Sequence, residues 1–225
     1  MFELQDRYIS FEREARPVSF YPQPVIPCEV NRDIPVGGRD LMRKYGAFSA
    51  YGGRMISCCD GFLSAVLALI FGGDKDFHHR DVSCVAYTAF GKLLCWSKDL
   101  RKIEIDLLRS TVECPALFNE KKRNANPEIL FGSLLSAIDV DTFDEEDDSG
   151  KLLFERAKER MGPLAYGQCY GFRLALPLGG YRSLDKLEKL SAPEHFSFLA
   201  QLQPFTLIDW GTTSDFGLRE IRQIG

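Results

Sequence analysis

The chain has 225 residues, of which 45% are hydrophobic, and a formal net charge of -4 at pH 7. This length suits one large domain or two small ones, and the hydrophobic content is ample for a sizeable core. So mild a negative charge argues against broad binding to nucleic acid or to an acidic membrane surface, and we expect neither as a direct partner.

The first part of the chain is expected to be an extended arm followed by two helices. Residues 1–36 hold prolines at 17, 22, 24, 27 and 35, and proline removes backbone donors and fixes φ. A short helix is predicted over residues 39–45, ended by Gly46 in a left-handed conformation. A second helix is predicted from near Asp60 to the glycine pair that begins at Gly72, and its apolar character on almost all sides predicts burial.

The centre of the chain changes to strand periodicity. Four short segments are rich in β-branched and aromatic residues and are separated by turn-like breaks such as Phe90-Gly91. This pattern predicts an antiparallel meander. Its strands are expected within residues 81–90, 92–97, 102–108 and 110–114.

Helices and strands both recur in the last third. A helix over residues 126–138 is expected to begin with Asn126 as its N-cap and Pro127 in the first position. Another, over residues 150–162, has apolar side chains every three to four residues and ends at Gly162. The remaining segments are a predicted helix over 193–202, a strand over 205–210 and a tail without clear pattern over 211–225.

Residues 162–180 contain five glycines and two prolines, which raises the question of a phosphate-binding loop. Such a loop needs a lysine after its glycines or a G-x-G-x-x-G spacing. Here Gly179 and Gly180 are followed by Tyr181. We therefore interpret this segment as scaffold, a β-hairpin with tight ends formed by residues 169–172 and 173–177.

The seven cysteines form no C-x-x-C pair, and several lie within apolar stretches. Buried free thiols in a reducing compartment explain this usage better than a disulfide framework does. The charged opening, MFELQDRYISFERE, lacks the apolar region of a standard secretory signal. The longest apolar run, residues 62–71, is too short to span a bilayer. We therefore expect a cytoplasmic protein.

Few residues suggest catalysis. His78 and Asp81 form an H-x-x-D spacing that some nucleases use, but adjacent histidines point apart, so a surface turn is favoured over a metal site. Cys59 precedes a predicted helix start, which could lower its pKa, yet His195 is far along the chain and a packing role is favoured. We expect no catalytic residue, no metal and no cofactor. An enzyme that uses Cys59 or His78 remains an alternative.

The segment that we call the acidic segment, residues 139–148, holds seven carboxylates and no basic residue. Its register does not fit an EF-hand, because Phe143 and Asp144 would occupy the fifth and sixth positions. The acidic segment is interpreted either as a solvated linker or as a patch that docks on a basic partner. The candidate partner-binding residues are Asp139, Asp141, Asp144, Glu145, Glu146, Asp147 and Asp148.

Residues 153–202 carry a family likeness. They resemble the C-terminal domain of type VI secretion immunity proteins that protect bacteria against a DNase effector. The shared features are a helix that ends in Gly162-Pro163-Leu164, the strand Cys169-Tyr170-Gly171-Phe172 after Tyr166, the stretch from Leu176 to Gly180, and a helix that contains Glu194-His195 and Leu199-Ala200-Gln201-Leu202.

The preceding part of the chain resembles the GAD-like domain that commonly accompanies that domain. The stretches DLMRKYGAFSAYGGRM and AYTAFGKLLCWS are similar to its helix entry and its hairpin. The resemblance implies a division into an arm (1–36), a GAD-like domain (37–125), a C-terminal immunity domain (126–210) and a tail (211–225).

The expected fold is α+β, with a central antiparallel or mixed β-sheet covered by helices and with both segments packed as one compact body. The resemblance implies a protein without catalysis that binds a cognate DNase toxin, encoded by the adjacent gene, and blocks its active site or its DNA-binding surface. A non-catalytic interaction or regulatory module of the same fold, without a toxin partner, is the alternative.

Overall fold

The computed structural model describes residues 2–21, 30–137, 139–210 and 218–225. At its centre lies the antiparallel meander that the strand periodicity predicts. The central strands β4 and β5 are apolar and buried on both sides, β6 and β7 are buried at alternate positions, and pairing with neighbours satisfies the backbone groups of all four. The four strands are β4 (Ser83–Thr88), β5 (Lys92–Ser97), β6 (Arg101–Asp106) and β7 (Thr111–Glu113).

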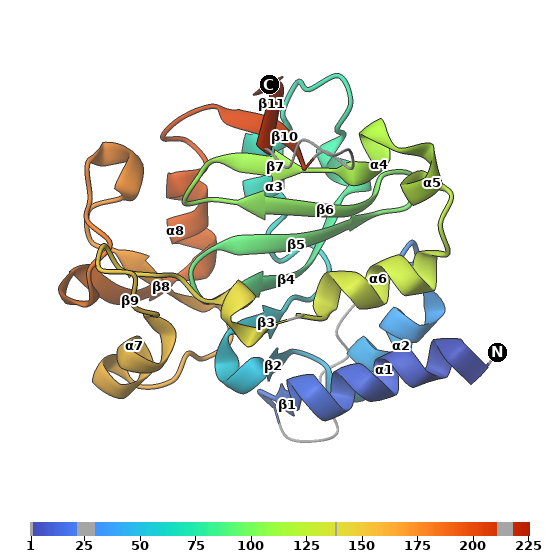
Figure 1. The fold of residues 1–225 in the computed structure, drawn as a ribbon, viewed down its shortest axis with the longest axis horizontal. Helices are drawn as coiled ribbons and strands as arrows, with labels where there is room; N and C mark the ends of the chain where they lie inside the picture. The colour runs from blue at the N-terminus through green and yellow to red at the C-terminus, as the bar shows by residue number, and fades with distance from the viewer. Residues whose placement is uncertain (1, 22–29, 138, 211–217) are drawn as a thin grey trace.

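Further strands extend the meander on both sides into one nine-stranded sheet with the order β1-β2-β3-β4-β5-β6-β7-β10-β11 (Figure 1). Neighbouring strands are antiparallel except β7 and β10, which are parallel. The predicted mixed α+β architecture is thus confirmed. The added strands are β1 (Val18–Ser19), β2 (Phe48–Ala50), β3 (Met55–Ser57), β10 (Phe205–Trp210) and β11 (Leu218–Ile224).

Helices cover both faces of the sheet, and alternate side chains of β5 pack against the helices on opposite faces. Leu93 and Cys95 enter the core beneath α3 (Ser64–Phe71) and α8 (Ala192–Leu199). The alternate residues Leu94 and Trp96 enter a second core, with α1 (Phe2–Ala15), α2 (Val36–Tyr45) and α6 (Pro127–Leu135). Figure 1 shows α6 in front of the sheet, where it packs against β5 and β6.

The N-terminus is not an extended arm throughout, because residues 2–15 form α1. This stretch has no proline, and the predicted arm was inferred from prolines that lie later in the sequence. The helix is held on the body by Tyr8, whose hydroxyl donates to Glu128 Oε2 at 2.9 Å. The prolines at 22, 24 and 27 lie outside the described residues.

The predicted helix ends are mostly confirmed. Asn126 caps α6 by accepting from the amide of Glu128 at 2.9 Å, and Gly162 ends α7 (Phe154–Met161) with a φ of 79°. The helix α3 begins later than expected, because Asp60 accepts from the Ser83 hydroxyl at 3.1 Å instead of capping a helix. Two short helices were not predicted, α4 (Pro115–Phe118) and α5 (Glu120–Arg123).

Two predictions at the C-terminal end need correction. The strand β8 (Gln168–Phe172) pairs with β9 (Leu187–Ser191), not with residues 173–177. Residues 176–178 form a 3-10 turn that contains Pro177, and proline has no amide to donate to a strand partner. The prediction of a tail without regular structure is also wrong for β11, which pairs with β10. The rest of the predicted tail, residues 211–217, lies outside the described residues.

Candidate functional site

The acidic segment is anchored to the body through an aromatic side chain. Its first part is a 3-10 turn, η3 (Val140–Phe143), and Asp139 caps this turn by accepting from the amide of Asp141 at 3.2 Å. Phe143 is buried, with its ring centroid 5.2 Å from that of Tyr51. The segment is therefore a fixed part of the surface and not a free linker.

Asp144 points inward and organises the chain that follows. Its side chain has no solvent exposure, and its Oδ1 accepts from the amides of Glu145 and Phe154 at 2.8 Å each. Phe154 is the first residue of α7, so the carboxylate lies at a helix N-terminus, where negative charge is stabilised. Burial nevertheless raises the pKa of Asp144, although these amides oppose the shift.

Glu145 and Asp147 are also committed to the fold. Both carboxylate oxygens of Glu145 accept from the Arg109 guanidinium, at 2.7 and 3.0 Å, and this pairing raises the pKa of Arg109. Asp147 accepts from the Ser149 hydroxyl at 2.6 Å and from Arg156. These hydrogen bonds hold the pKa of Asp147 well below its usual range.

The other four carboxylates of the segment face solvent. Within the described parts of the chain no ion pair involves any of them. They are therefore the members of the predicted set that a partner can reach, and their role in binding stays a prediction. They are Asp139, Asp141, Glu146 and Asp148.

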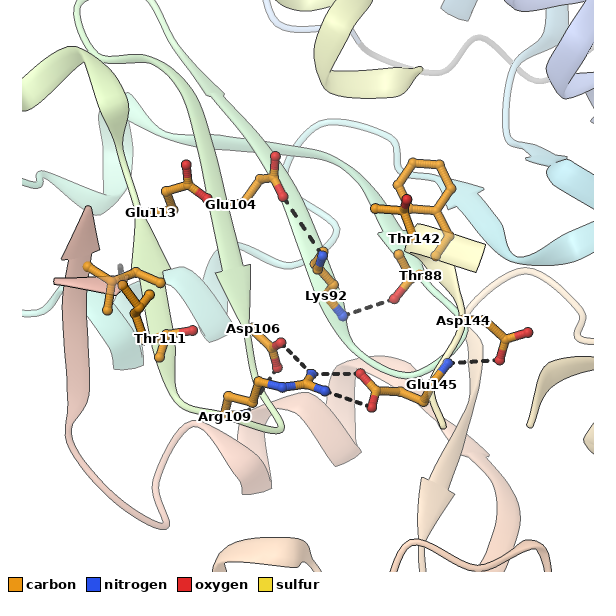
Figure 2. Close-up of a pocket in the computed structure, with 13 residues that line it drawn as sticks. Thr88, Lys92, Glu104, Asp106, Arg109, Thr111, Glu113, Thr142, Asp144 and Glu145 are labelled. Carbon is orange, nitrogen blue, oxygen red and sulfur yellow. Dashed lines mark hydrogen bonds and ion pairs between the residues drawn. The ribbon is translucent and has the colours of Figure 1, made fainter. Parts of the chain in front are cut away.

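Beside the acidic segment, the sheet has an open polar area, which we call the open face and define by Lys92, Glu104, Asp106, Arg109 and Glu113. Lys92, Glu104, Asp106 and Glu113 come from β5, β6 and β7, on the side opposite the large core, and Arg109 follows β6. A cavity of about 410 Å³ lies here, between the strands and the acidic segment. Figure 2 shows Arg109 between Asp106 and Glu145 and joined to both.

The open face contains an unfavourable pair of charges. Glu104 and Glu113 are directly paired residues of β6 and β7, and like charges opposite each other destabilise a sheet. Lys102 contacts Glu104 at 2.5 Å. Lys92 also lies 4.0 Å from Glu104, so lysines of the chain itself partly compensate the repulsion within this pair. Burial raises the pKa of Glu113 and the charge of Glu104 raises it further, although the positive charges of nearby lysines oppose the shift.

The open face and the acidic segment form one continuous surface. A second cavity, of about 680 Å³, is lined by most of the acidic segment together with Arg109 and Arg182. Arg109, Asp144 and Glu145 line both cavities. We call this joint surface the acidic groove. The sequence signal that could have revealed its sheet half is the alternation Lys102, Glu104, Asp106, which places every second side chain on an uncovered face.

The residues considered for catalysis do not come together. His78 is exposed beside a 3-10 turn (His79–Asp81), as expected for a surface turn. Cys59 is disulfide-bonded, so the expectation of free thiols is wrong there, whereas Cys58, Cys84, Cys95, Cys114 and Cys169 are buried and free. His195 packs over Gly171, where a Cβ would lie 2.5 Å from its Nε2, and burial lowers its pKa.

The described residues contain no group of three or more histidine, cysteine, aspartate or glutamate residues arranged to hold a metal ion. None of the helices in this part of the chain has the length and apolar character that a membrane span needs.

The chain resembles known proteins at two levels. Residues 133–203 match the family model described as "T6SS immunity protein Tdi1, C-terminal", which confirms the resemblance of the C-terminal segment. The crystal structure of Atu4351 from Agrobacterium tumefaciens is similar over 100% of this chain and 98% of that one, with 28% sequence identity and a TM-score of 0.78. No curated protein matches the chain.

Proposed function

We propose that this chain, whose residues 133–203 match the model of the T6SS immunity protein Tdi1 C-terminal domain, is a cytoplasmic protein that binds and neutralises a cognate DNase effector. The family match is the observation that carries the proposal. The effector is the product of the adjacent gene, and neutralisation occurs by occlusion of its active site or its DNA-binding surface. Residues 37–125 form the GAD-like part and residues 126–210 the immunity part.

The charge of the acidic groove supports a nuclease as the partner. A DNase must hold a polyanion, so the surface that contacts DNA is basic. Exposed carboxylates such as Asp141, Glu146 and Asp148 complement such a surface and accelerate its capture. Rapid capture is an advantage when the toxin acts on the chromosome.

The open face supports a direct contact with a basic side chain. Glu104 and Glu113 face each other on neighbouring strands, and their repulsion is offset in part by Lys102 and Lys92, which contact Glu104. An arginine or lysine of the toxin placed between their carboxylates would relieve this repulsion and form charge-assisted hydrogen bonds. The stability lost in the free protein would thus be recovered in the complex.

The first test is titration of the purified chain into the nuclease domain of the adjacent effector. We expect DNA cleavage to fall to zero at a stoichiometric ratio and the two proteins to co-elute. Undiminished DNA cleavage in the presence of excess protein, with no complex formed, would contradict the proposal and favour the alternative of a general interaction module. Protection that persists in cells after Cys59→Ala, His78→Ala and His195→Ala would exclude catalysis by these residues.

The location of the contact is tested by reversal of the four exposed charges, with Asp139, Asp141, Glu146 and Asp148 changed to lysine. We expect the association rate at low salt to fall about tenfold or more, because steering is lost. The matched control changes the exposed residues Asp33, Asp99, Glu120 and Glu159 to lysine, which gives the same net charge. An equal fall in both variants would show that net charge alone matters and would remove the acidic segment from the interface.

A further inference from the structure

The glycine-rich segment presents apolar side chains to solvent. We call residues 173–183, which join β8 to the chain before β9, the apolar loop. Leu174 is 50% exposed, Leu178 is 52% exposed and Tyr181 is 69% exposed. Single exposed apolar residues are ordinary, but three large ones on one short loop are a feature of interaction surfaces. In Figure 1 the loop projects from the body as the orange turn at the upper left.

The backbone of the apolar loop is tightly held. The amides of Leu178 and Gly180 both donate to the carbonyl of Ala175, at 2.9 and 3.2 Å, and Ala175 is buried. Gly179 has a φ of 88°, and a Cβ on Gly180 would lie only 1.9 Å from the Leu174 carbonyl oxygen. Both glycines are therefore required for this turn. A loop ordered before binding loses little conformational entropy when a partner docks.

The apolar loop is continuous with the acidic groove. The amide of Asp148 donates to the carbonyl of Arg182 at 2.9 Å, and Arg182 lines the same cavity as the acidic segment. On its other side, Arg160 of α7 donates to the Leu184 carbonyl at 3.0 Å, which fixes the chain just after the loop. Both the acidic segment and the apolar loop fall within residues 133–203.

The acidic groove and the apolar loop would contribute different properties to a long-lived complex. Charge complementarity mainly raises association rates, whereas a few desolvated aromatic and aliphatic side chains contribute most of the binding energy. We propose that Leu174, Leu178 and Tyr181 are the apolar anchor of the toxin interface. This inference rests on the proposed function. The partner is the same DNase effector, and the three side chains insert into an apolar pocket at the edge of its basic surface.

The test is a kinetic measurement with an immobilised, catalytically inactive nuclease domain of the adjacent effector. Leu178→Ser and Tyr181→Ser are made together, and both side chains are exposed, so the thermal midpoint should not change. We expect each of the two substitutions to raise the dissociation rate about tenfold, so that the double variant dissociates about a hundredfold faster. The association rate should stay within about twofold of wild type. Phe118→Ser on α4, 44% exposed, is the matched control and should leave both rates unchanged.

The outcomes separate this inference from the proposed function. Wild-type binding with an unchanged dissociation rate in the Leu178 and Tyr181 variant overturns the apolar anchor and leaves the immunity function standing. Wild-type protein that does not bind the nuclease domain at all overturns both. A Leu174→Ser variant provides an independent check, because it lies at the opposite end of the same turn and should also accelerate dissociation.

Discussion

The Nε of Arg54 lies 3.5 Å from the Oδ2 of Asp144, and both side chains are almost fully enclosed. Arg54 comes from the turn before β3, whereas Asp144 belongs to the acidic segment. The guanidinium also lies 4.6 Å from the ring of Phe154 and pairs with Glu155 at 2.9 Å. Arg54 therefore joins the N-terminal strands to the start of α7 and fixes the wall of the acidic groove.

Loss of the Asp144 carboxylate should destabilise the protein strongly. In Asp144→Ala the amides of Glu145 and Phe154 lose their acceptor and Arg54 loses an enclosed counter-charge. We expect the free energy of unfolding to fall by roughly 3 kcal/mol, measured by urea denaturation. Asp141→Ala, at an exposed position of the same segment, is the control and should change it by less than about 0.5 kcal/mol. Equal effects would mean that Asp144 is not a structural anchor.

Glu113→Gln should separate stability from binding. Removal of one charge from the Glu104–Glu113 pair is expected to raise the free energy of unfolding by about 0.2 to 1 kcal/mol. If the open face receives a basic side chain of the toxin, the same change should weaken the complex. The two measurements are urea denaturation and the equilibrium affinity for the inactive nuclease domain. Glu159→Gln, on the exposed side of α7, should alter neither, and unchanged affinity in Glu113→Gln would remove this face from the interface.

The buried histidine predicts a pH dependence of stability. Burial lowers the pKa of His195 in the folded chain, so between that value and the unfolded value of about 6.5 the unfolded chain binds more protons. The free energy of unfolding should therefore decrease as the pH falls below about 6.5. Denaturation at pH 7.5 and 5.5 tests this. His195→Gln should show a smaller difference between the two pH values, whereas His78→Gln should keep the wild-type difference.

The last strand depends on a bidentate ion pair. The Arg222 guanidinium of β11 contacts both carboxylate oxygens of Asp74, whose side chain is 1% exposed. Asp74→Asn should lower the free energy of unfolding by roughly 3 kcal/mol. Asp76 also contacts Arg222, at 2.7 Å, but is 35% exposed, so Asp76→Asn should cost less than about 1 kcal/mol. Hydrogen exchange of the β11 amides would locate the effect, and protection that survives in Asp74→Asn would contradict it.

The elements that the sequence predicted are those whose signal is local. The meander β4 to β7 follows from short segments rich in β-branched and aromatic residues with turn-like breaks between them, and α6 follows from Asn126 at its N-cap and Pro127 in its first position. The strand β11 has no such signal, because its residues are mainly polar and its order comes from pairing with β10 and from the distant Asp74. The helix α1 was not predicted, because the extended arm was inferred for all of residues 1–36 from prolines that follow the helix.

The candidate site was predicted in composition but not in geometry. The carboxylates of residues 139–148 predicted a charged surface, yet three of them point to arginines that sequence reasoning did not connect to them. Asp144 meets Arg54 and Glu145 meets Arg109, contacts that only the folded chain brings together. The open face required knowledge of which part of β6 is left uncovered by α6, and this depends on packing between segments far apart in sequence.

The parallel pairing of β10 with β7 has a consequence for synthesis of the chain. Until residues 205–210 have left the ribosome, β7 has an unpaired edge, which is a template for association with other chains. The sheet is completed only when β10 and β11 have been made. A nascent or truncated copy that stops before β10 therefore lacks two strands of the sheet, and the time needed to synthesise β10 and β11 sets the earliest moment at which a new molecule is fully folded.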